Sequence, residues 1–130
     1  MNIKHKSDKH KQIALWAANC AEQALKYARK RALFRRHKNS KVFHGFEKKY
    51  PNDKRPRKAI KAARDWAFGR ITIAEARKFA LDSHKAARKA KDQSAMAAAR
   101  SAGHAAATAH VWKHAFAAES YAVKSQSLVL

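Results

Sequence analysis

Apolar residues recur every three or four positions along most of the chain, which is the period of helices with one buried face. The first run predicts a helix that begins at Ser7 or Asp8, either of which can cap it, and continues to about Lys38. The residues expected to face inward are Ile13, Trp16, Ala17, Cys20, Ala24, Tyr27 and Ala28. Residues 39–40 are its expected end, and residues 41–49 form either a short helix or a loop.

A second helix is predicted for residues 55–68. A turn precedes it, because the residue before Pro51 is pushed out of the helical conformation. Asn52 or Asp53 can cap this helix, Pro56 suits its first turn, and Gly69 can end it in a left-handed conformation. Its expected inner stripe is Ala59, Ile60, Ala63, Trp66 and Ala67, and its expected outer face is Arg57, Lys58, Lys61 and Arg64.

The remaining pattern predicts two more helices. Thr72 and Glu75 have the spacing of a capping box, so a helix is expected from there to about residue 90. Its inward residues should be Ile73, Ala76, Ala80, Ala87 and Ala90. Asp92 or Ser94 can cap a last long helix over residues 95–124, with a bend expected near Gly103 or His110. Alanines cover every face of this helix, which is typical of a buried central helix.

Composition supports a helical fold. The 130 residues, one domain's worth of chain, include 30 alanines but only 3 glycines and 2 prolines. Alanine is the best helix former and is depleted in strands. We therefore expect an all-α, single-domain bundle of four or five helices with an Ala-rich C-terminal helix at its centre. Residues 1–12 form a basic N-terminal arm in this scheme, and residues 26–49 form a basic segment.

Several classes of protein are disfavoured. The single cysteine, Cys20, cannot make an internal disulfide, which disfavours a disulfide-stapled secreted scaffold. No apolar run approaches the roughly 20 residues of a membrane span, and the start of the chain has no apolar signal-peptide core. A cytoplasmic protein without membrane contact is therefore expected.

Charge points to an acidic partner. The chain has a net charge of +21, and 13 of these charges lie between Lys26 and Lys61. Such a density of cations attracts phosphate backbones or acidic protein surfaces, and Phe34, Phe43 and Phe46 within it could stack on bases. The predicted partner-binding residues are Arg29, Lys30, Arg31, Arg35, Arg36, Lys38, Lys41, Lys54, Arg55, Arg57, Lys58 and Lys61.

The sequence gives little support for a catalytic site or a metal site. There is no metal-protease motif and no glycine-rich phosphate loop, and Cys20 falls on an inward stripe, so we predict no catalytic residues and no cofactor. His110 and His114 are four residues apart and could share a metal, with His84 approaching one of them. The favoured interpretation is that these are core histidines, with Thr108 within reach of His104.

Three blocks of sequence, in order, resemble a known family. The first holds Ala17, Ala18, Cys20, Ala21 and Glu22. The second is residues 48–60 (KKYPNDKRPRKAI) followed by Ala62, Ala63, Arg64 and Trp66. The third comprises residues 84–90, 97–100 and 103–111 (GHAAATAHV), then His114 and Ala115. Together they resemble the immunity proteins of bacterial polymorphic toxin systems, in the group with an immunity-five-like domain.

The resemblance implies a helical, cytoplasmic, non-enzymatic protein that protects its maker by binding a cognate toxin. The family-motif positions are Cys20, Asn52, Asp53, Arg55, Pro56, Arg57, His84, His104, Thr108, His110 and His114, most of which are expected to hold the fold. Two departures stand out: an extra basic segment between the first two blocks, and a charge that a basic nuclease cleft would repel. The leading hypothesis is an inhibitor that covers an acidic target surface. The alternative is a sequence-non-specific nucleic-acid-binding protein that uses the same face, or an inhibitor of a nucleic-acid-handling complex.

Overall fold

The computed structural model describes residues 3–28, 43–44 and 46–127. These residues form the all-α bundle that the sequence predicts, and the predicted cations from Arg29 to Lys41 lie outside them. The helices are α1 (Ile3–Lys26), α2 (Phe46–Lys49), α3 (Arg55–Ala67), α4 (Ile73–Lys89), α5 (Gln93–Ala107) and α6 (His114–Ser127), and two short strands are β1 (Tyr27–Ala28) and β2 (Phe43–His44). The described residues thus hold one helix more than the upper expected count, the short α2.

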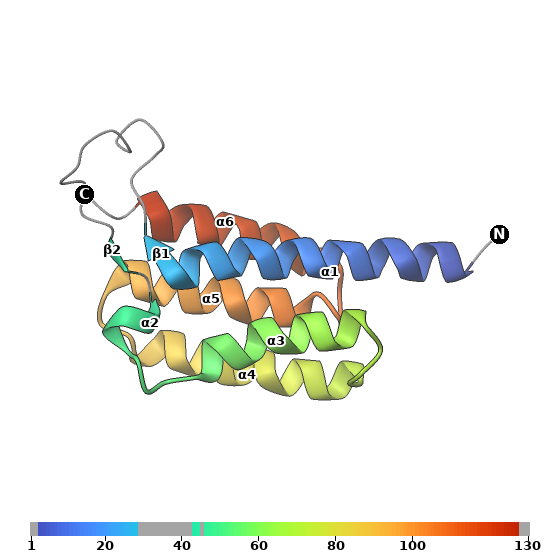
Figure 1. The fold of residues 1–130 in the computed structure, drawn as a ribbon, viewed down its shortest axis with the longest axis horizontal. Helices are drawn as coiled ribbons and strands as arrows, with labels where there is room; N and C mark the ends of the chain where they lie inside the picture. The colour runs from blue at the N-terminus through green and yellow to red at the C-terminus, as the bar shows by residue number, and fades with distance from the viewer. Residues whose placement is uncertain (1–2, 29–42, 45, 128–130) are drawn as a thin grey trace.

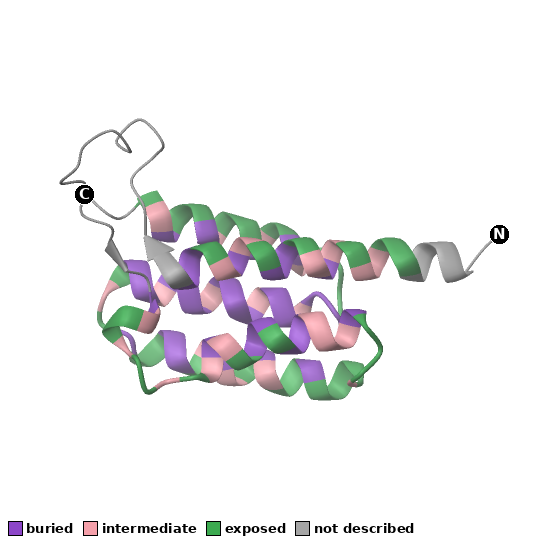
Figure 2. Cartoon of the chain, in the orientation of Figure 1, coloured by how far each residue is buried: buried purple, intermediate pink, exposed green. Residues whose placement is uncertain are grey.

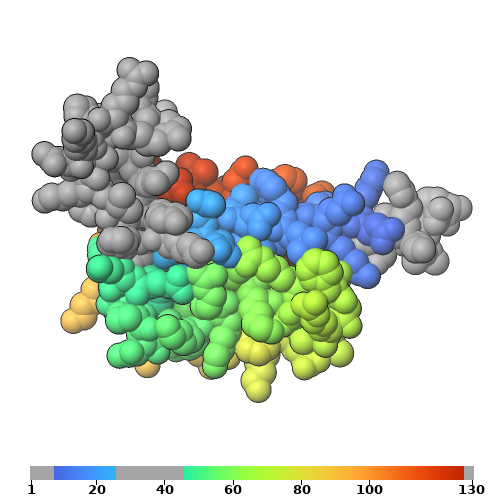
Figure 3. Space-filling view, in the orientation of Figure 1, coloured from blue at the N-terminus to red at the C-terminus, as the bar shows by residue number. Residues whose placement is uncertain are grey.

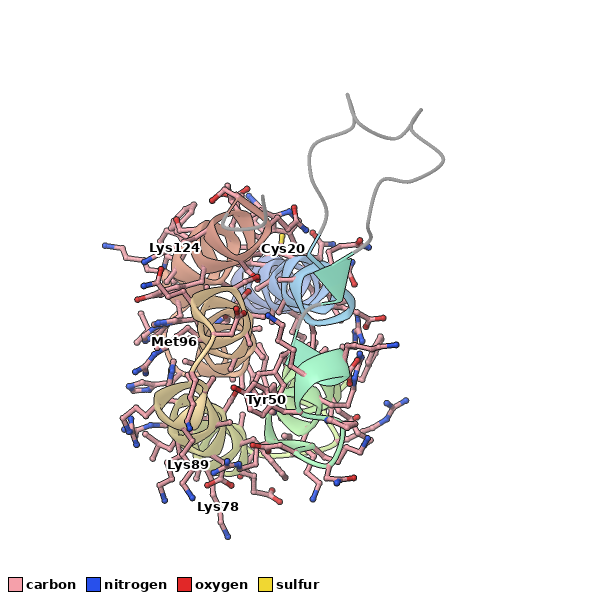
Figure 4. All side chains as sticks on the ribbon, turned by 90° about the vertical axis from the view of Figure 1, so that its left-hand side faces the viewer. Cys20, Tyr50, Lys78, Lys89, Met96 and Lys124 are labelled. Carbon is pink, nitrogen blue, oxygen red and sulfur yellow. The ribbon has the colours of Figure 1, made fainter. Side chains whose placement is uncertain are left out.

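The five long helices form two layers. Figure 1 shows α1 and α3 in front of α4, α5 and α6, and the end-on view of Figure 4 shows α4, α5 and α6 stacked along one side. α5 contacts α1, α3, α4 and α6, so it occupies the centre of the bundle. No helix of the described chain is long and apolar enough to cross a membrane.

The core is built almost entirely of alanine. Every buried hydrophobic residue among those described is alanine except Leu25, Phe46 and Ile60. Figure 2 shows the buried positions continuing along α5 and on the facing sides of its neighbours. Such small side chains let helix backbones approach closely, and this explains why a chain with so few large apolar residues still has a continuous core.

Buried serines connect the helices across this core. Ser83 of α4 donates to the carbonyl of Ala99 at 2.8 Å, and Ser101 of α5 donates to the carbonyl of Ala118 at 2.6 Å. Ser94 and Ser125 each donate to the other's carbonyl, at 2.8 and 2.7 Å. These bonds satisfy buried hydroxyl groups and set the register of α4 and α6 against α5.

The helix boundaries follow the local sequence at several places. The Thr72 hydroxyl accepts from the Glu75 amide at 3.1 Å while Glu75 accepts from the Thr72 amide, so the predicted capping box forms. Asp92 caps α5 by accepting from the Ala95 amide at 2.8 Å. Gly69, with φ of 76°, follows α3 in the left-handed conformation. At α3 the cap position is Lys54 rather than Asn52 or Asp53, although Asp53 accepts from the Arg55 amide.

The predicted last helix is not continuous but is divided into α5 and α6. Residues 108–113 form turns between α5 and α6, so the chain reverses close to His110, whereas Gly103 lies buried inside α5. Thr108 donates its hydroxyl to the His104 carbonyl at 3.0 Å, and the amides that follow bond three residues back, which tightens the end of the helix. The reversal lets α6 fold onto α5 and bury Ala115, Ala118 and Ala122. Only the first half of the predicted helix is therefore central.

The predicted first helix is also wrong in its ends. α1 already includes Ile3, so residues 3–12 are helical turns rather than a separate arm, and it stops at Lys26. There the backbone becomes extended, because Tyr27 and Ala28 pair with His44 and Phe43 in an antiparallel register. Phe46 of α2 then closes the core near this end of the bundle.

Three aromatic or branched side chains do not lie where the pattern put them. Trp16 is 41% exposed and Ile73 is 46% exposed, although both were expected to face inward, and Trp66 is half-buried. The buried positions nearby are alanines, Ala17 and Ala18 beside Trp16 and Ala76 three residues after Ile73, because small side chains suit closely packed helices.

Candidate partner-binding surface

An ion-pair network holds α1, α2 and α3 together. The Arg57 guanidinium donates to both carboxylate oxygens of Glu47, at 3.0 and 2.8 Å, and lies 3.3 Å from Glu22. Arg64 donates to Glu22 at 2.6 Å. The bond to Glu47 raises the pKa of Arg57 above its usual value. The bidentate Arg57–Glu47 pair is of the strongly held kind, and Arg64 links Glu22 and Asn19 of α1 to α3, so both arginines stabilise the fold.

Other acidic residues are also engaged within the chain. Arg55 donates to both oxygens of Asp53, at 2.9 and 2.6 Å. Asp65 accepts from Lys61 at 2.6 Å and from Arg70 at 3.3 Å, and Lys49 lies 2.8 Å from Asp92. Most of the few carboxylates in the chain therefore bind cations or helix ends within the protein itself.

What remains is a surface of lysines along α3 and α4, which we call the lysine surface. Its members are Lys54, Lys58, Lys61, Lys78, Lys85 and Lys89. All six are exposed, and within the described part of the chain only Lys61 forms a direct salt bridge, while Lys89 lies close enough to Asp53 to lower its pKa. Figure 3 shows the α3 and α4 side as the lower half of the molecule, and Figure 4 shows Lys78 and Lys89 pointing away from the bundle.

Exposed apolar side chains lie among these cations. Leu81 is 62% exposed on the same face of α4 as Lys78 and Lys85, and Phe68 is 61% exposed just after α3. The Arg70 guanidinium lies 5.2 Å from the centre of the Phe68 ring. Leu81 and Phe68 thus place exposed apolar area beside the lysines, and aromatic residues are enriched at protein interfaces whereas lysine is depleted there.

The structure separates the predicted partner-binding residues into three groups. Lys54, Lys58 and Lys61 are exposed on the lysine surface, whereas Arg55 and Arg57 are half-buried in the ion pairs described above. The third group, from Arg29 to Lys41, lies outside the described residues. Sequence reasoning missed Lys78, Lys85 and Lys89, because it followed the local density of charge and not the side-by-side packing of α3 and α4.

The predicted pairing of histidines is different in the structure. His110 lies exposed in the turn before α6, so it does not share a helix face with His114. Instead, the Nδ1 atoms of His104 and His114 are 3.0 Å apart, and the His84 ring centre lies 4.9 Å from that of His104. The approach of His84 was expected from its place on α4. No group of three or more metal-binding side chains with suitable geometry occurs among the described residues.

Most other family-motif residues have structural environments. Pro56 and Thr108 are buried, Asn52 is exposed in the turn before α3, and Asp53 binds Arg55. Cys20 is half-buried between α1 and α6 (Figure 4), where burial and then the Glu119 charge raise the pKa of its thiol. A raised thiol pKa lowers the thiolate fraction, which is the opposite of what a nucleophile needs.

Comparison with known proteins links the chain to one family. The family model described as Imm-5 like putative immunity protein matches residues 32–128. The match starts within the basic segment and includes the second and third motif blocks, while the block around Cys20 precedes it. No curated protein and no solved structure matches the chain significantly.

Proposed function

The chain belongs to the family of Imm-5 like putative immunity proteins, and from this premise we propose that it binds and neutralises a cognate toxin without catalysing a reaction. A cytoplasmic site of action is part of this proposal, since an immunity protein has to protect the cell that makes the toxin. The proposed inhibitor acts by covering a surface that the toxin needs.

One observation supports the lysine surface as the contact region: most of its lysines form no salt bridge within the described residues. Five of its six lysines form no salt bridge among the described residues, while Arg55, Arg57 and Arg64 of α3 are already paired with carboxylates. The free ammonium groups can pair with the carboxylates of another protein, and Leu81 supplies an apolar anchor beside them. The proposed target surface is therefore acidic with an apolar depression.

The net charge of the chain also limits which kind of surface on the toxin it can cover. A chain of net charge +21 is repelled by the basic cleft of a typical nuclease. We propose that the covered surface is an acidic region of the toxin. The cations of residues 29–41 lie outside the described residues and stay predicted partner-binding residues.

The test is a pull-down of the full chain from its native host, with exhaustive nuclease treatment and a high-salt wash. The variant pair Lys58→Glu with Lys85→Glu should lose the captured protein. Lys113→Glu with Lys124→Glu makes the same charge change on the turn before α6 and on α6 itself, and should keep it. Equal capture by both double variants would reject the lysine surface as the contact region.

The nucleic-acid alternative has one observation in its favour, which is that free lysines outnumber carboxylates so strongly on one face. It predicts nucleic acid that co-purifies at low salt and no protein that survives nuclease. Its affinity should also fall with salt at a log–log slope of about −0.9 per phosphate contacted on double-stranded DNA. A specific protein interface with an apolar centre should keep most of its affinity over the same range of salt.

A further inference from the structure

A cluster of imidazoles lies on the side of α5 that faces outward between α4 and α6. It comprises His84 of α4, His104 of α5 and His114 of α6, with Arg100 one turn before His104. The His84 Nδ1 is 3.0 Å from Arg100 Nη1, and the two Nδ1 atoms of His104 and His114 are 3.0 Å apart. The Tyr121 ring stacks on His104 with 5.4 Å between ring centres. We call these groups the imidazole cluster.

Hydrogen bonding defines where the protons are. A guanidinium can only donate, so Nδ1 of His84 accepts from Arg100 and the neutral ring carries its proton on Nε2. One of His104 and His114 donates through Nδ1 and the other accepts. Burial lowers the pKa of His84 and of His104 to about 4, with Arg100 adding to both effects. At neutral pH the cluster is therefore a set of uncharged rings beside a guanidinium.

No carboxylate balances this cation among the described residues. The charges that shift the pKa values of the three histidines are those of Arg88, Arg100, His110 and the histidines themselves. The nearby carboxylates are used elsewhere: Asp82 acts on Arg55, Asp92 caps α5, and Glu119 lies near Cys20. Each of the other half-buried arginines among the described residues has an acidic partner, whereas Arg100 forms no salt bridge there.

The cluster is held in place by a close approach of two helices. A Cβ atom at Gly103 would lie 2.8 Å from two atoms of the His84 ring, so only glycine allows this ring to rest against α5. His84, Arg100, His104 and His114 are all half-buried, so part of each residue is accessible to solvent. Donor groups from three helices thus converge on one rigid and accessible place.

From this convergence we infer that the imidazole cluster is an oxyanion-binding site that accepts a carboxylate side chain of the partner protein. The inference rests on the proposed function for the identity of that partner. A carboxylate can accept two hydrogen bonds from one guanidinium and supplies the charge that the site lacks. The donors gather at one point instead of following a line, which suits a single carboxylate better than the repeated phosphates of a nucleic acid.

Binding at this site should be linked to pH. An anion close to an imidazole favours its protonated form, so bound carboxylate raises the pKa of His84 and His104. Protonation in turn strengthens binding as the pH falls from 7 towards 5. The groups that face the two rings are Arg88 from α4, Arg100 from α5, and His114 and Tyr121 from α6. The positive charges of Arg88 and Arg100 oppose protonation of the free site, and a bound carboxylate offsets them.

The test uses nuclear magnetic resonance of the full chain with isotope-labelled histidines and a hexapeptide of glutamates as the probe. The ring signals of His84, His104 and His114 should move saturably with the peptide and titrate at higher pH in its presence. The His10 ring, whose Nε2 lies 2.6 Å from the Thr108 carbonyl, serves as the internal reference and should not move. His84 adjoins Lys85 of the lysine surface, so the signals of His104 on α5 and His114 on α6 distinguish binding at the cluster from binding at that surface.

Two variants of equal charge change sharpen the test. Arg100→Gln should weaken the peptide response of the three rings about tenfold, because it removes charged hydrogen bonds. Lys78→Gln, on the part of α4 that points away from α6 (Figure 4), should change it less than about twofold, as expected of an exposed charge. Arg100→Lys, which keeps the charge without the fork, should fall between them, and the amide spectrum of each variant reports its folding.

Three results would overturn the inference. The first is a peptide titration that leaves the three ring signals of the wild type unmoved. The second is equal weakening by Arg100→Gln and Lys78→Gln. The third is an oligonucleotide that moves the ring signals when the peptide does not. None of these measurements needs the toxin, so failure of toxin capture with an intact peptide response would reject the proposed function and not the site.

Discussion

Adding a single methyl group at position 103 would create a steric clash. The His84 ring occupies the volume that a side chain would need, and α5 meets α4 there. Gly69 makes a useful comparison, because a Cβ atom there would meet nothing within 4 Å and the cost comes only from the positive φ.

Gly103→Ala should therefore destabilise the protein by about 1–3 kcal/mol, since the ring has to leave its place against the helix. Gly69→Ala should lower stability by only about 1 kcal/mol. Urea denaturation of both variants measures the difference. A Gly103→Ala protein as stable as the wild type would mean that the His84 ring is not fixed.

Single residues also show how far the sequence could predict the candidate site. The exposure of Lys54, Lys58 and Lys61 follows from their place opposite the alanine stripe of α3. The engagement of Arg57 does not, because Glu47 and Glu22 reach it from other elements. Local charge density identifies cations but not which of them already have a partner.

Short sequence motifs predict three helix ends correctly, whereas the expected ends of α1 and the expected cap of α3 differ from the structure. The capping box at Thr72, the Asp92 cap and the Gly69 terminus all depend on contacts within a few residues, and all three are observed. The break between α5 and α6 depends on what α6 can bury against α5, and the periodicity of alanines does not contain that information. The four serines that bond between helices were missed for the same reason.

Thr72→Ala tests the capping box. It removes the hydroxyl that accepts from the Glu75 amide, and should destabilise the protein by about 1 kcal/mol. Thr72→Ser keeps this acceptor and should stay close to the wild type. Thermal unfolding followed by circular dichroism distinguishes the two, and equal melting temperatures for both variants would contradict the role of the cap.

For the whole molecule, the buried histidines make stability depend on pH. The pKa of His84 and of His104 is lowered to about 4 in the folded protein, whereas the unfolded chain titrates near 6.5. Between these values the unfolded chain binds more protons, so the free energy of unfolding should decrease as the pH falls from 6.5 to 4. The lowered pKa values of Asp53 and Asp65, caused by Arg55 and Lys61, add a loss at still lower pH.

Urea denaturation at pH 7.5, 5.5 and 4.5 measures this dependence. His84→Gln should flatten the pH dependence, because one of the three lowered histidine pKa values is removed. His110→Gln changes an exposed histidine in a turn and should leave the slope as in the wild type. A wild-type protein equally stable at all three values would contradict the burial of the imidazoles.

The alanine core has a genetic consequence. Every amino acid that replaces alanine through a single base change is larger than alanine, except glycine. A single base change that replaces a buried alanine therefore either adds volume between closely spaced helices or inserts glycine, which weakens a helix by about 1 kcal/mol. The outer faces, which carry the exposed lysines, can therefore change in sequence without loss of stability. In the interior, almost every single amino-acid replacement destabilises the fold.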